Sequence, residues 1–325
     1  MISPFESDPI LVEVVRSGVV ESVHHGRVAV THHDGSLAAS LGAAQAPMFP
    51  RSASKPLQAV GMLRAGLDVG AELLALICSS HSGEPFHQDG VRRILTAHGL
   101  DVAALQTPPD WPADEAVKAA VLRAGGEPTP IAMNCSGKHA GMLATAVVNG
   151  WPVLNYRDPD HPVQRAILAT IDELAAESVT DVAVDGCGAP LFALSLVGLA
   201  RAFGRLAASA AGPEAQVADA IRRHPKWVSG TRRDELQLHQ AIPGLIAKGG
   251  AEAVYAAGLP DGRGVALKIS DGYQRARPAA MAGVLQRLGF EGEALTRLAS
   301  AAVLGHGERV GEIRPVAATL ARLQA

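Results

Sequence analysis

The feature that most limits how this chain can fold is the placement of its strand-like segments at the two ends. Residues 10–41 alternate β-rich runs with turn signals at Ser17-Gly18, His25-Gly26 and Asp34-Gly35. Short β-rich runs separated by such turns are typical of an antiparallel meander. The N-terminal end therefore predicts neighbouring antiparallel strands.

A second β-rich region spans 262–287 near the C-terminus. Residues 264–270 have the composition of a strand, Asp271-Gly272 is a hairpin signal, and 273–283 fit a return strand. The spacing of apolar residues after this region predicts two more helices, at 280–289 and 292–303.

The long middle of the chain, residues 52–225, has helical periodicity. Apolar residues recur there at intervals of three and four, and Pro162 and Pro190 are placed as first-turn prolines. We expect an α/β fold in which an antiparallel sheet from both chain ends is packed with helices, as one domain over 1–325. The predicted helices of the middle are 55–65, 88–98, 114–124, 139–149, 162–176, 190–204 and 213–223.

Composition excludes several classes of protein. The net charge is −3, whereas nucleic-acid binders usually carry a basic face. No window approaches the roughly 18 apolar residues of a membrane helix, and the N-terminus lacks a basic leader followed by a cleavage site. The three cysteines, Cys78, Cys135 and Cys187, are too sparse for a disulfide framework. We therefore expect a cytoplasmic protein that binds neither nucleic acid nor membrane.

The first candidate for chemistry is the pair Ser52 and Lys55. Positions i and i+3 of a helix share a face, so the lysine amine can reach the serine hydroxyl. A serine becomes a nucleophile when a base takes its proton, and a lysine can be that base. The chain has only six lysines among its 29 basic residues. Because arginine supplies most of its positive charge and only lysine can lose its proton near neutral pH, a lysine here is a stronger indication of a chemical role. Taken alone, the motif also fits a helix capped by Ser52 or Ser54, with Lys55 solvated.

Three other segments have the same character of a polar loop leading into a helix. The loop Cys78–Glu84 carries Ser80, which could be a second nucleophile or an oxyanion donor. The segments Asn134–His139 and Asp185–Pro190 hold two of the cysteines. Cys135 with Lys138 and Cys187 with Asp185 could form a metal site. Alternatively, Cys135 could pair with His139 as a nucleophile, or the cysteines could be buried inert thiols.

Together these segments resemble the asparaginase II family, the rhizobial-type L-asparaginases. The resemblance rests on the motifs PRSASKP, CSSHSGE, NCSGKH, DGCG and GVALKISDG, in this order and spacing, and extends over about residues 10–315. It implies a serine β-lactamase-like fold, hydrolysis of L-asparagine to L-aspartate and ammonia, and a homodimer. The motifs carrying it begin at positions 50, 78, 134, 185 and 264.

The resemblance also implies the roles of particular residues. Ser52 with Lys55 and Ser80 with Lys268 correspond to two catalytic Ser–Lys pairs. Zinc, one ion per subunit, is implied at Cys135, Lys138 and Cys187. Arg51 is our candidate cation for the substrate carboxylate, and the expected substrate-binding positions are Arg51, His139, Asp185 and Gly186.

One departure and three alternatives accompany this interpretation. Some relatives carry a further cysteine near the segment that here spans 228–235, and this chain has none there. A glutaminase would differ by one methylene of substrate. A β-lactamase or peptidase would need S-D-N and K-T-G companions, which are absent. A non-enzymatic zinc-stabilised binding protein would not need Ser52 or Lys55.

Overall fold

The computed structural model describes residues 7–323, which group into two units. The first unit takes in the described residues up to Ala53, Leu194–Ala208, and the described residues from Gln237 onward. The second unit comprises Ser54–Ala193 and Ser209–Leu236. The expectation of a single catalytic domain over 1–325 stays a prediction.

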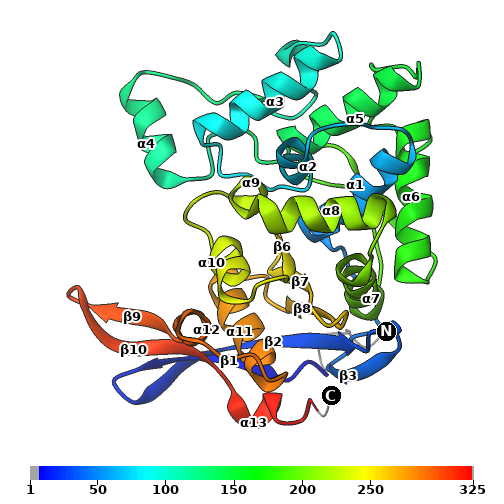
Figure 1. Cartoon of the computed structure of the whole chain (residues 1–325). Helices are drawn as coiled ribbons and strands as arrows, with labels where there is room; N and C mark the ends of the chain where they lie inside the picture. The colour runs from blue at the N-terminus through cyan, green and yellow to red at the C-terminus, as the bar shows by residue number, and fades with distance from the viewer. Residues whose placement is uncertain (1–6, 324–325) are drawn as a thin grey trace. The chain divides into compact units, whose positions relative to one another are not determined.

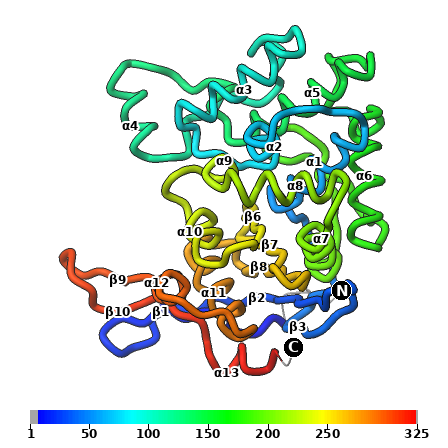
Figure 2. The backbone as a smooth tube through the Cα atoms, viewed as in Figure 1, coloured from blue at the N-terminus to red at the C-terminus, as the bar shows by residue number. Residues whose placement is uncertain are grey.

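One eight-stranded sheet forms the framework of the first unit within the described residues, in the order β6-β7-β8-β2-β1-β10-β9 with β3 paired to β2 (Figure 1). Its pairings are antiparallel. Figure 2 shows the blue β1 beside the red β10, and this pairing joins the two chain ends. The predicted sheet from both ends is therefore confirmed. The strands are β1 Ile10–Arg16, β2 Val19–Thr31, β3 Leu37–Leu41, β6 Ile246–Gly250, β7 Val254–Gly258, β8 Gly264–Ile269, β9 Ala301–Gly305 and β10 Glu308–Pro315.

Helices cover both faces of the sheet at β7 and β8, where every residue is buried. Val265, Leu267 and Ile269 belong to the core that also contains α11. Gly264 faces the other way, where an added Cβ would lie against Ala200 of α7. Because side chains alternate along a strand, Lys268 lies on the α7 face of β8. The helices of this unit are α7 Leu196–Ala208, α11 Arg277–Arg287, α12 Glu293–Ala299 and α13 Ala317–Leu320.

The second unit is largely helical. Helix α1 packs against α6, α2 packs against α5, α8 and α9, and α3 packs against α5. A short hairpin, β4 paired with β5, interrupts the helices. The bounds are α1 Lys55–Arg64, α2 Ala71–Ile77, α3 Pro85–Ala97, α4 Glu115–Arg123, α5 Ser136–Val148, α6 Pro162–Ala175, α8 Gly212–Arg223, α9 Pro225–Ser229, β4 Val182–Val184 and β5 Pro190–Phe192; α10, Asp234–Ala241, runs along the chain from this unit into the first.

Most predicted helices of the middle are confirmed, but the C-terminal β-rich region 262–287 is only partly correct. Strand β8 is present, whereas the predicted return strand 273–283 is the 3-10 turn Gln274–Ala276 followed by α11. The segment RPAAMAGVLQR places Pro278 in the first turn and is rich in alanine, and both features favour a helix. Residues 301–303, predicted as helix, begin β9.

Two turn assignments also differ. Pro190 begins β5 instead of a helix, because it pairs with Val184 across the hairpin. His25-Gly26 is not a turn but lies inside the long strand β2. A Cβ on Gly26 would come within 2.5 Å of the Lys268 carbonyl oxygen, so glycine is needed there for the close approach of β8. Among the described residues, no helix is long and apolar enough to cross a membrane.

Candidate active site

Lys55 is the first residue of α1 and lies almost completely buried, with 1% of its surface exposed. Its Nζ lies 2.5 Å from the carbonyl oxygen of Ser79, 3.2 Å from Ser80 Oγ and 3.1 Å from Cys135 Sγ. The Lys55 amine therefore contacts three polar groups of the second unit at once.

Ser80 is presented by the loop between α2 and α3. Its backbone N–H donates to the Val228 carbonyl, and that of His81 donates to the Asn134 carbonyl. These two N–H groups are therefore already paired with backbone carbonyls, and the oxyanion-donor role considered for the loop stays a prediction. The Ser80 hydroxyl is buried and accepts a hydrogen bond from the Lys55 amine.

Cys135 and Cys187 lie together although they come from different elements. Cys135 stands just before α5, and Cys187 lies in the turn of the β4–β5 hairpin. The two sulfur atoms and a carboxylate oxygen of Asp185 lie within 4.8 Å of one another. Lys138 Nζ donates to Cys187 Sγ at 3.1 Å.

A close helix–helix contact sets the position of this cluster. A Cβ on Gly137, in the first turn of α5, would come within 2.5 Å of the Leu76 carbonyl oxygen at the end of α2. Only glycine permits this approach without a shift of the backbone. The contact brings the start of α5, with Cys135 and Lys138, to the loop that carries Ser80.

Charge in the cluster is shared among its members. A hydrogen bond from Cys187, together with Lys55 and Lys138, holds the pKa of Cys135 well below its usual range despite burial. The same hydrogen bond and burial raise the pKa of Cys187. Burial lowers the pKa of Lys138, but Cys187, Cys135 and Asp185 outweigh it and the net shift is upward. The hydrogen bond from Cys187 and the two neighbouring lysine side chains therefore favour the thiolate form of Cys135.

The donor set around the cysteines fits zinc. Zinc prefers thiolate, imidazole and carboxylate ligands in a tetrahedron, in which thiolates about 2.3 Å from the metal lie about 3.8 Å apart. Cys135, Cys187 and Asp185 converge within a comparable space and are shielded from solvent or partly so. A carboxylate thus joins the expected set of Cys135, Lys138 and Cys187.

His139 lies one helical position beyond Lys138. Its Nδ1 is 2.7 Å from the hydroxyl of Tyr156, and its buried Nε2 has no hydrogen-bond partner among the described residues. Burial lowers the pKa of His139 to about 4, although the Cys187 sulfur opposes this shift. Gly186, exposed in the turn beside Cys187, presents only backbone groups.

The remaining predicted residues belong to the first unit. Arg51 and Ser52 lie in a 3-10 turn, Arg51–Ser54, and Arg51 has a left-handed φ of 51°, a strained conformation often found at functional sites. Lys268 Nζ donates to the Glu252 carbonyl at 2.8 Å, and the Glu252 carboxylate lies 3.8 Å from Arg51. Burial, with help from Arg27 and Arg51, lowers the pKa of Lys268, which favours the neutral amine needed in a base.

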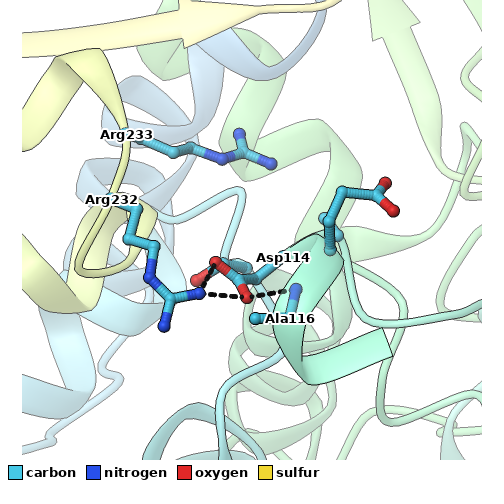
Figure 3. Close-up of a pocket in the computed structure, with 7 residues that line it drawn as sticks. Asp114, Ala116, Arg232 and Arg233 are labelled. Carbon is cyan, nitrogen blue, oxygen red and sulfur yellow. Dashed lines mark hydrogen bonds and ion pairs between the residues drawn. The ribbon is translucent and has the colours of Figure 1, made fainter. Parts of the chain in front are cut away.

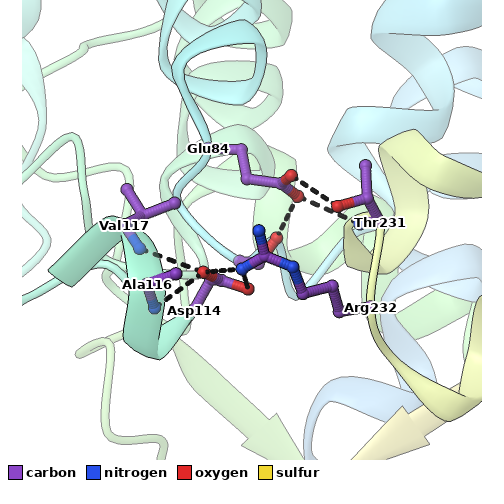
Figure 4. A network of polar contacts seen from close by, with 7 residues as sticks. Glu84, Asp114, Ala116, Val117, Thr231 and Arg232 are labelled. Carbon is purple, nitrogen blue, oxygen red and sulfur yellow. Dashed lines mark hydrogen bonds and ion pairs between the residues drawn. The ribbon is translucent and has the colours of Figure 1, made fainter. Parts of the chain in front are cut away.

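A polar network that the sequence interpretation missed supports the Ser80 loop (Figure 4). Ser82 Oγ donates to Glu84, and Glu84 accepts from the backbone N–H and hydroxyl of Thr231. Asp114 donates its backbone N–H to the Ser82 carbonyl, and its carboxylate accepts from Arg232 at 2.7 and 2.9 Å. Serine, acid and arginine residues are common on surfaces, so no sequence signal marked this network.

Three histidines in the second unit predict a pH dependence of stability. Burial lowers the pKa of His87 and of His139 to about 4, and that of His81 well below its usual range. Below the unfolded pKa of about 6.5, the unfolded chain therefore binds protons that the folded chain does not. We expect the free energy of unfolding to fall between about pH 6.5 and about pH 4, by up to ~1.4 kcal/mol per pH unit for each histidine.

Urea unfolding at a series of pH values measures this slope. His87→Gln should reduce it, because the amide still donates to the Lys226 carbonyl that His87 Nε2 contacts but takes up no proton. The exposed His33 provides the control substitution, His33→Gln. An equal slope in wild type and His87→Gln would show that His87 is not the group that titrates.

The sequence profile of the L-asparaginase II family matches residues 12–315. The chain belongs to the L-asparaginase II family. A search of curated proteins returned no match.

Several solved structures share weak similarity with this L-asparaginase II family member. The structure described as "Crystal Structure Analysis of Mglu" is 14% identical with a TM-score of 0.44, covering 87% of this chain and 72% of that one. The structure of its tris and glutamate form is 13% identical with a TM-score of 0.42. This chain covers 62% of that chain, less than two thirds of its length. The structure described as "EstCE1, a hydrolase with promiscuous acyltransferase activity" is 12% identical with a TM-score of 0.37, covering 83% of this chain and 92% of that one. With these TM-scores below 0.5, the serine β-lactamase-like part of the expected fold rests on the family resemblance alone.

Proposed function

We propose that this protein hydrolyses the side-chain amide of L-asparagine to L-aspartate and ammonia. The observation that carries the proposal is the buried hydrogen bond from Lys55 Nζ to Ser80 Oγ, in a chain of the L-asparaginase II family. A serine with a buried amine at hydrogen-bond distance has the arrangement of a nucleophile and its base. We also propose that the protein is a homodimer in the cytoplasm.

In the proposed first step, the neutral Lys55 amine accepts the Ser80 hydroxyl proton and Ser80 Oγ bonds to the amide carbon of asparagine. The C–N bond then breaks, the leaving nitrogen takes the proton from Lys55, and ammonia departs from a β-aspartyl ester. Water attacks the ester, giving its proton to Lys55, which returns it to Ser80 Oγ. The Cys135 thiolate, 3.1 Å from Nζ, stabilises the ammonium form of Lys55 during each transfer.

Ser52 is the competing nucleophile, as the S-x-x-K spacing with Lys55 suggests. Lys268, with its lowered pKa, is proposed as a second proton acceptor. Arg51, His139, Asp185 and Gly186 are proposed to contact the substrate. The carboxylate of the amino acid needs a cation, and among these residues Arg51 supplies one.

Ammonia release from asparagine and glutamine, by wild type, Ser80→Ala and Ser52→Ala, tests the proposal. We expect release from asparagine by the wild type and its loss in Ser80→Ala. Loss in Ser52→Ala alone would instead assign the acyl group to Ser52. Faster release from glutamine would make the protein a glutaminase, and no release from either amide would contradict the proposal.

We propose zinc at Cys135, Lys138 and Cys187, with the Asp185 carboxylate beside them. When bound, the ion would act as a Lewis acid that orients the polar groups of the substrate. The ligands must lose protons to bind it, so zinc occupancy should fall as the pH drops from about 8 to about 6.

Elemental analysis checks this expectation directly. We expect about one zinc per chain in the wild type and a loss of most of it in Cys187→Ala, because one of about four ligands is removed. Cys78→Ala is the matched control, since Cys78 is also a buried cysteine but lies outside the cluster. Chelation should raise KM more than it lowers kcat. An unchanged KM after chelation would show that the ion does not orient the substrate.

A further inference from the structure

A pocket of about 430 Å³ lies in the second unit between the start of α4 and the segment before α10 (Figure 3). Its volume is within the range of about 300–1,000 Å³ usual for small-molecule sites. No role in the proposed hydrolysis is assigned to it. The lining residues are Ser82, Ala113, Asp114, Glu115, Ala116, Arg232 and Arg233.

Two of the four charges on the pocket wall neutralise each other. Arg232 Nη1 lies 2.7 and 2.9 Å from the two oxygens of the Asp114 carboxylate. The same carboxylate accepts from the backbone N–H groups of Ala116 and Val117 as the cap of α4. Asp114 and Arg232 are therefore paired with each other within the pocket wall.

The other two charges, Arg233 and Glu115, have no ion-pair or hydrogen-bond partner in the described part of the chain. Figure 3 shows the Arg233 side chain reaching over Arg232 and Asp114 without a dashed contact. The two groups are of opposite sign, line the same pocket, and do not pair with each other. A ligand that satisfies both must carry a negative and a positive group.

We propose that this pocket binds a small zwitterion of the α-amino acid class, with its carboxylate on Arg233 and its ammonium toward Glu115. A guanidinium matches a carboxylate in charge and in its planar pair of donors. The Ser82 oxygen, whose proton is donated to Glu84, can accept from the ammonium. A simple anion such as phosphate would meet the carboxylate of Glu115 without compensation.

The site is separate from the Ser80 hydroxyl but structurally joined to it. Ser82 lines the pocket, and its carbonyl accepts from the backbone N–H of Asp114. The inference rests on the pocket charges and not on the proposed hydrolysis. If the proposed hydrolysis is contradicted, the proposed zwitterion site is unaffected, and the reverse also holds.

Equilibrium dialysis of the full chain with labelled L-alanine tests the proposal, because alanine has the zwitterion but no side-chain amide to hydrolyse. We expect one binding event per chain that Arg233→Gln and Glu115→Gln each weaken at least ~10-fold, as expected for loss of a charge-assisted contact. Arg123→Gln, an exposed arginine on the same helix as Glu115, should leave it unchanged. Acetate and methylamine, each with one of the two charges, should compete at least ~10-fold more weakly than glycine.

Two results would overturn the inference. Equal alanine affinity in wild type, Arg233→Gln and Glu115→Gln would place any bound alanine elsewhere, including at Ser80. Acetate or phosphate competing as well as glycine would make the pocket a simple anion site. Circular dichroism and thermal midpoints check that the variants are folded. If Arg233→Gln is not folded, the alanine affinity of Glu115→Gln, a substitution at an exposed residue at the start of α4, tests the inference alone.

Discussion

Lys55→Met should lower kcat for ammonia release by at least ~1,000-fold, since removal of the base from a nucleophile–base pair typically costs this much or more. The methionine side chain fills a similar space in the buried site but accepts no proton. It also removes the donor that Ser80 Oγ and the Cys135 thiolate share. Steady-state ammonia release from asparagine measures the effect.

Lys55→Arg separates the role of base from that of cation. Arginine keeps the positive charge beside Cys135 but does not lose its proton, so it should be nearly as inactive as Lys55→Met. Lys118→Met provides the control for loss of a lysine outside the cluster. Retention of more than a tenth of wild-type kcat in Lys55→Met or Lys55→Arg would exclude Lys55 as the base.

Arg27→Met should destabilise the first unit by about 3–5 kcal/mol, because it leaves a buried carboxylate without its ion-pair partner. Arg27 Nε lies 3.3 Å from Asp8 Oδ2, and the two side chains are 1% and 0% exposed. Asp8 also accepts from the Ser270 hydroxyl and the Ala43 backbone N–H. These bonds tie the chain before β1 to β2, β8 and the segment after β3.

Chemical denaturation with fluorescence detection gives the free energy of unfolding. Asp8→Asn combined with Arg27→Met should cost clearly less than Arg27→Met alone, because no buried charge remains. Arg16→Met is the control, since Arg16 and Glu21 form an exposed pair at 2.8 Å of the kind worth about 0–1 kcal/mol. Equal losses in the Arg27 and Arg16 variants would show that the buried pair has no special weight.

The parts of the fold visible in the sequence are those with local signals. Helical periodicity and first-turn proline identify Pro162–Ala175, and alternation with glycine turns identifies the N-terminal strands. Strands β6 and β7 were not predicted, because they are short and buried on both faces. Their sequences therefore show no alternation of apolar and polar residues. Helix α11 was mistaken in part for a strand because the Asp271-Gly272 hairpin signal suggested one.

The sequence alone determined which residue types are available to the site: two serines, three lysines, a cysteine pair and their motifs, in an order that matches the L-asparaginase II family. Tertiary structure decided how they combine. Lys55 and Cys135 are 80 residues apart and Lys138 and Cys187 are 49 apart, so their contacts depend on how α1, α5 and the β4–β5 hairpin pack. For this reason Lys55 meets Ser80, Asp185 joins the cysteines, and Arg233 and Glu115 come to line one pocket. Spacing along a chain specifies only neighbours within a turn of helix, whereas these contacts form when helices bury their apolar faces together.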